Sequence, residues 1–162
     1  MKLVIKQKLL SWFGTYHVYD EQDNIIYTIK GELSWGHKLK IYDKDGTEIA
    51  MLEEEILHLL ARFNMIVNNE NVGQIIQKLK FVKPQYEVTQ KQWIIKGNIW
   101  TTNFSVTDSS GAEIMIINRK LFKLHDTYTI DVHDSNNAIY ALMIGLTLDI
   151  MEQKAASMNA TT

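Results

Sequence analysis

The chain has 162 residues with 46% hydrophobic and 10% aromatic content, which predicts one domain with a substantial core and argues against disorder. Its formal net charge of −2 argues against a general nucleic-acid binder, so no nucleic-acid partner is expected. It has no cysteine, which excludes disulfides, thiol catalysis, zinc ribbons and iron–sulfur clusters.

The beginning of the chain reads as a strand. Residues 1–8 alternate apolar with charged or polar side chains, whereas a secretory signal needs an uninterrupted apolar stretch. We therefore expect an opening strand near residues 3–9. We also expect a cytoplasmic protein, in contact with a membrane only peripherally if at all.

A short pattern then recurs along the chain: an aromatic residue or Leu, followed two positions later by a β-branched residue or Met. Its copies begin at Tyr16, Leu39, Phe63, Tyr86, Phe104 and Tyr128. Most copies run into stretches rich in Asp, Asn and Gly, which favour turns. A second apolar run follows each of the first five copies, at 25–29, 49–52, 72–79, 93–95 and 114–117. Strand, turn and strand at this spacing predict a series of β-hairpins, about twelve antiparallel strands in all.

Residues 53–62 are ambiguous, because Ile56, Leu59, Leu60 and Phe63 also fit a helical stripe. We predict a strand that runs into a turn. The acidic run at 53–55 is then expected to be a solvated strand end or turn.

The segment from Ala138 to Met151 shows no period-two alternation and no turn, and it follows three good N-cap residues, Asp134, Ser135 and Asn136. It predicts a helix over about 136–153 that is apolar on nearly every face and must be buried all round. Its apolar run, 138–148, is too short to cross a bilayer.

A sheet of about twelve strands can close into a barrel, which encloses more space than its own side chains fill. We therefore predict a closed antiparallel barrel around a buried C-terminal helix, with Gly145 allowing the barrel wall to approach closely. This single domain covers residues 1–156, and residues 157–162 are expected to be a disordered tail. Asp149 is either a buried carboxylate or, as we favour, a group at the point where the helix meets water or a lysine.

Several segments resemble the LURP-one-related family of the Tubby C-terminal-like superfamily, and the likeness favours a bacterial member. They are Ile5-Lys6-Gln7-Lys8, residues 42–46, residues 126–130 and Leu146-Thr147-Leu148-Asp149. The resemblance implies a twelve-stranded barrel around a central C-terminal helix. It also implies little about activity: tubby domains recognise membrane phosphoinositides through basic side chains outside the barrel, and plant relatives are linked to defence.

The search for catalytic motifs favours a non-enzymatic protein with no cofactor and no metal site. No nucleophile elbow, P-loop, zinc-protease motif or dinucleotide fingerprint occurs, and no two histidines have ligand spacing on one element. A pocket enzyme using His17, His37, His125 and Asp149 is the least favoured alternative. Among the tryptophans, Trp93 is expected in the core, and Trp12 and Trp35 as lids over a barrel mouth.

Basic residues form the one pattern that suggests a ligand. They occur two apart on predicted strands, which puts each pair on one outer face, and two more end the eleventh strand. The candidate anion-binding residues are Lys6, Lys8, Lys38, Lys40, Lys78, Lys80, Arg119 and Lys120. If pairs are adjacent in the closed sheet, they form a strip that attracts anions such as phospholipid headgroups; otherwise they are an ordinary solvated exterior. The function we favour is a monomeric binding domain for anionic lipid. The alternative is a protein-interaction module with no lipid ligand.

Overall fold

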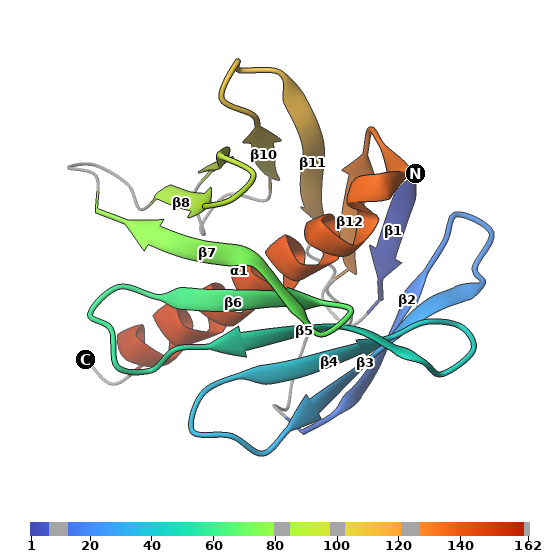
Figure 1. Cartoon of the computed structure of the whole chain (residues 1–162), viewed down its shortest axis with the longest axis horizontal. Coiled ribbons are helices and arrows are strands. Elements are labelled where there is room, and N and C mark those ends of the chain that lie inside the picture. The colour runs from blue at the N-terminus through green and yellow to red at the C-terminus, as the bar shows by residue number, and fades with distance from the viewer. Residues whose placement is uncertain (7–12, 80–84, 98–102, 121–126, 161–162) are drawn as a thin grey trace.

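The computed structural model describes residues 1–6, 13–79, 85–97, 103–120 and 127–160, with the side chains of Arg119 and Lys120 excepted. Twelve antiparallel strands close into one barrel in which each strand pairs with its neighbours in sequence and β1 pairs with β12. The strands are β1 (Lys2–Ile5), β2 (Thr15–Tyr19), β3 (Ile25–Glu32), β4 (Lys38–Tyr42), β5 (Glu48–Glu54), β6 (Arg62–Val67), β7 (Glu70–Lys78), β8 (Gln85–Val88), β9 (Trp93–Gly97), β10 (Asn103–Thr107), β11 (Glu113–Lys120) and β12 (Thr127–Val132). The predicted fold is confirmed (Figure 1).

The strands form where the sequence alternates apolar with polar residues, because successive side chains of a strand point to opposite faces. Leu39 and Ile41 of β4 are buried inside, for example, while Lys38 and Lys40 lie outside. The segment 53–62 is strand and then turn, as predicted, since β5 ends at Glu54 and β6 begins at Arg62. Trp93 lies in the core, also as predicted.

A short 3₁₀ turn (Ser135–Asn137) leads into the helix α1 (Ala138–Asn159), which passes through the barrel (Figure 1). The Asp134 side chain accepts a hydrogen bond from the backbone N–H of Asn136 and so caps the 3₁₀ turn. Residues 141–150 are buried without interruption, because the barrel wall surrounds the helix on every side. Within the residues that the structure describes, no helix has the length and apolar character needed to span a membrane.

The helix is longer than the predicted 136–153. It continues to Asn159, into the segment for which the sequence led us to expect disorder. The Lys154 ammonium pairs with Glu54 of the barrel, and the Ser157 hydroxyl donates a hydrogen bond to the Lys154 carbonyl. These contacts hold the last turns of the helix after it has left the core.

The barrel has two different ends. At one, which we call the turn end, short connections join β2–β3, β4–β5, β6–β7, β8–β9 and β10–β11, and the chain enters α1. Aspartates fix several of these turns: Asp43 accepts hydrogen bonds from the backbone N–H of Asp45 and of Thr47, and Asp108 binds Ser110 and Ala112 in the same way. The opposite end, where α1 leaves the barrel, we call the exit end.

Candidate functional site

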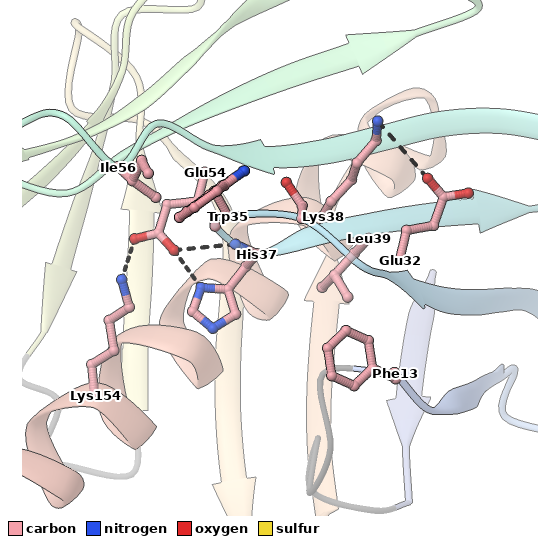
Figure 2. A pocket seen from close by; sticks show the side chains of 11 residues that line it. Phe13, Glu32, Trp35, His37, Lys38, Leu39, Glu54, Ile56 and Lys154 are labelled. Atoms are coloured by element: carbon pink, nitrogen blue, oxygen red, sulfur yellow. Dashed lines mark hydrogen bonds and ion pairs between the residues drawn. The ribbon is translucent and has the colours of Figure 1, made fainter.

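Two hollows lie side by side at the exit end. The first, of about 260 Å³, lies between the β3–β4 connection, the end of β5 and α1 (Figure 2). The second, of about 440 Å³, lies between the β5–β6 connection and the last turns of α1. Glu54, Ile56 and Lys154 line both, so the side chain of Glu54 forms part of the wall between them.

The Glu54 carboxylate is the centre of a polar cluster that we call the Glu54 clasp, made of Glu54, His37 and Lys154. One carboxylate oxygen accepts a hydrogen bond from the backbone N–H of His37, at 3.3 Å. The same oxygen also pairs with Nδ1 of the His37 ring. The other oxygen binds the ammonium of Lys154 (Figure 2). The clasp therefore joins the end of β5, the approach to β4 and the emerging helix.

Sequence reasoning missed the clasp, because the acidic run at 53–55 was expected to be solvated. That expectation is wrong for Glu54, whose side chain is only 5% exposed. Burial alone would raise the pKa of the Glu54 carboxyl, but the hydrogen bonds from His37 and Lys154, with their charge, lower that pKa to about 2. The carboxylate is thus ionised throughout the neutral range.

Apolar side chains project from the exit end. Among the residues that the structure describes, ten large apolar side chains are exposed, and eight of them stand at this end. We call these eight the crown: Phe13, Leu33, Trp35, Ile56, Leu57, Leu59, Leu79 and Met158. Trp35 is 95% exposed, so the expectation that it caps the barrel mouth is wrong; Trp12 lies outside the described residues.

The turn end is acidic instead. Its connections, at 20–24, 43–47, 68–69, 89–92, 108–112 and 133–134, hold seven carboxylates and two lysines. These segments therefore carry −5 of formal charge, and the rest of the chain carries +3, since the whole chain carries −2. The two ends of the barrel therefore differ in chemistry: the connections at the turn end are acidic, and those at the exit end expose apolar side chains.

Those predicted basic residues whose side chains the structure describes do not form a strip. Of these residues, Lys6 follows β1, Lys38 and Lys40 lie on β4 and Lys78 ends β7. The barrel places two other strands between β1 and β4, and two between β4 and β7. Lys6 pairs with Asp23 of the turn end, Lys40 with Glu32 and Glu48, and Lys78 with Glu87. The Lys38 ammonium is 3.8 Å from carboxylates of both Glu32 and Glu53.

The exit end still holds several of these positions. Lys38 begins β4 there, Lys78 ends β7, and the backbone of Arg119 and Lys120 ends β11. Lys8 and Lys80 lie outside the described residues.

The side chains considered for catalysis are dispersed. His17 lies on the barrel wall with its Nδ1 3.3 Å from the Thr28 hydroxyl, His37 belongs to the clasp, and His125 lies outside the described residues. Asp149 is buried, contrary to the expectation that it meets water, and it accepts hydrogen bonds from the Tyr128 hydroxyl and from the Gln153 amide at 2.9 Å. In the described part of the chain, no group of three His, Asp or Glu residues could hold a metal ion.

Comparison with known proteins identifies relatives that match over more than nine-tenths of the chain. A family model described as LURP-one-related matches residues 1–150. An uncharacterized protein of Bacillus subtilis strain 168, YxjI, is 24% identical over 152 residues, which cover 93% of each chain. The X-ray structure of a protein from Arabidopsis thaliana matches with a TM-score of 0.58 and 15% identity over 91% of each chain. At that identity the structural match establishes the fold alone.

Proposed function

This chain belongs to the LURP-one-related family, and on that premise we propose that it is a non-enzymatic domain that binds the anionic surface of a lipid membrane with its exit end. The observation that carries the proposal is the uneven distribution of charge between the turn end and the rest of the chain. The turn connections carry −5 and the rest of the chain +3, so an anionic surface repels the turn end and attracts the remainder. The attachment is peripheral and made by surface side chains.

The lysines at the exit end supply the local attraction. Lys38 and Lys78 are partly exposed, and their nearest carboxylates are 3.6–3.8 Å away. Exposed ion pairs of this kind contribute at most about 1 kcal/mol, so a lysine can exchange its carboxylate for a lipid phosphate at little cost. Each lysine held near an anionic membrane contributes about 1 kcal/mol.

Binding is favoured over catalysis by the state of the polar groups in the hollows. The Glu54 carboxylate and the Nδ1 atom of His37 bond to each other, and the Lys154 ammonium bonds to the same carboxylate. These bonds join three elements, while the other described side chains considered for catalysis, His17 and Asp149, lie elsewhere on the wall and in the core, so no catalytic set is assembled among them.

The test is co-sedimentation with vesicles of phosphatidylcholine alone or mixed with phosphatidylglycerol, at low and at physiological salt. Lys78→Glu replaces an attraction by a repulsion, so we expect partitioning onto anionic vesicles to fall roughly 30-fold, equivalent to about 2 kcal/mol. Lys44→Glu, which makes the same charge change at the turn end, is the matched control and should bind nearly as wild type. Binding that ignores both lipid charge and salt would contradict the proposal, and no binding to any vesicle would favour the protein-interaction module.

A further inference from the structure

We infer that the crown inserts into the hydrocarbon of the bilayer, so that the barrel stands on the membrane on its exit end. The choice of a membrane as the partner rests on the proposed function. The inference adds the mode of attachment: apolar insertion that persists when salt screens the charges.

The first argument is the degree of exposure. Leu33, Trp35, Leu57 and Leu59 are 89%, 95%, 92% and 99% exposed, and they occupy the tips of two neighbouring hairpin connections. A folded chain gains nothing from holding these four large side chains in water. Clustered exposed apolar residues of this kind mark interaction sites.

The second argument is where these side chains do not occur. The turn end uses Asp, Asn and Gly for the same task of joining two strands, and it exposes only Met1 and Ile25 among the large apolar residues described. Connections in one barrel thus follow two compositions according to the end on which they lie. Strand packing does not require this difference, because the tips of connections at either end project beyond the barrel wall.

The third argument concerns the shape of the partner. The crown residues come from separate segments, and five of the eight line the two hollows, so they do not make a flat face: Phe13, Trp35, Ile56, Leu59 and Met158. Fluid hydrocarbon can surround each projecting side chain separately. Tryptophan and leucine beside lysines are also the composition of structures that lie at the membrane interface, and the acidic turn end is then directed away from the anionic surface.

The experiment uses the absence of native cysteine. An environment-sensitive fluorophore on Leu57→Cys reports on the crown, and the same label on Asp45→Cys reports on the turn end. With phosphatidylcholine–phosphatidylglycerol vesicles, we expect the crown probe alone to shift to the blue and to be quenched by lipids brominated on the acyl chain. The shift should survive at high salt.

A second variant measures the contribution of insertion. Each crown side chain that leaves water should strengthen partitioning about tenfold, so Trp35→Ser/Leu59→Ser should lower it about a hundredfold. Both positions are exposed, so the fold is expected to be unaffected. Ile25→Ser, an exposed apolar residue at the turn end, is the control and should bind as wild type.

The outcomes separate this inference from the proposed function. If the protein binds anionic vesicles while the crown probe remains in water, insertion is overturned and attachment by charge stands. Insertion into purely neutral vesicles would support the inference and contradict the anionic preference. If no vesicle is bound and the crown probe never shifts, both are overturned.

Discussion

At the scale of single residues, Glu54 has the largest consequences, because its carboxylate joins three elements that meet at the exit end. It bonds to His37 before β4, belongs to the end of β5, and holds Lys154 of α1. The acidic run gave no sign of this, since Glu53, Glu54 and Glu55 are identical in type. Only the register of β5, which directs Glu54 toward the emerging helix, distinguishes it from its neighbours.

We expect Glu54→Gln to destabilise the fold by about 2–3 kcal/mol at neutral pH, because the pKa of the carboxyl falls from 4.5 to about 2 on folding. A lowered pKa means that the ionised form stabilises the folded state. That contribution is complete above pH 4.5 and is lost as the pH falls toward 2. Urea unfolding of wild type and variant should therefore differ most at neutral pH and converge in acid.

The matched control is Glu53→Gln, one position away. Glu53 is 37% exposed and its carboxylate is 3.8 Å from the Lys38 ammonium, so its removal should cost less than about 1 kcal/mol. Equal losses for the two variants, or a Glu54 loss independent of pH, would show that the clasp does not stabilise the fold.

At the scale of elements, α1 is unusual because it has no solvent-facing side over residues 141–150. The sequence predicted this burial, because an uninterrupted apolar run of helical length leaves the helix no polar face for water. Its end could not be predicted in the same way. The last turns are held by the pairing of Lys154 with Glu54, and this partner is a hundred residues away in the chain.

Gly145 tests the fit between helix and wall. A Cβ atom at this position would stand 2.7 Å from Cδ1 of Ile130 on β12, closer than van der Waals contact allows. We expect Gly145→Leu to lower stability by about 1–3 kcal/mol through overpacking, measured as a reduced urea midpoint. Ala156→Leu, on the exposed end of the same helix, should change stability by no more than about 0.5 kcal/mol. An unchanged midpoint for the Gly145 variant would mean that the wall does not press on the helix.

At the scale of the whole molecule, barrel and helix share one core. Inward side chains of the strands and the apolar side chains of residues 141–150 of α1 belong to the same buried cluster. We expect hydrogen exchange to be slowest in the strands and in residues 138–150 together, and faster in 151–159, which lie outside the core. Rapid exchange of 138–150 beside protected strands would contradict a single cooperative unit.

A feature of this molecule could be predicted when the residues that signal it lie close together in the sequence. Alternation and turn residues lie within a few positions of one another, so strands, turns and the buried helix could be read directly. The family resemblance was confirmed for the same reason, because it rests on the order of such segments over residues 1–150.

The crown could not be recognised from local patterns, because an apolar residue next to a predicted strand is expected to be buried in the core. One signal was available: Leu33, Trp35, Leu57 and Leu59 fall between strands, where the other end of the barrel has Asp, Asn and Gly. Likewise the basic pairs were correctly placed outside the barrel on β4, but spacing along a strand says nothing about which strands become neighbours.

The position of α1 after all twelve strands also determines how this protein can be made. A ribosome adds residues from the N-terminus at about 5–20 per second, so every hairpin is translated before the helix that fills the space between them. Until β12 has been made, β1 lacks one of its two partners, and until α1 has been made, inner side chains such as Leu3 and Ile41 lack the helix that completes their core. Closure of the barrel around its helix therefore has to wait for the last of these elements to be translated, and the earlier hairpins expose their apolar inner faces until then.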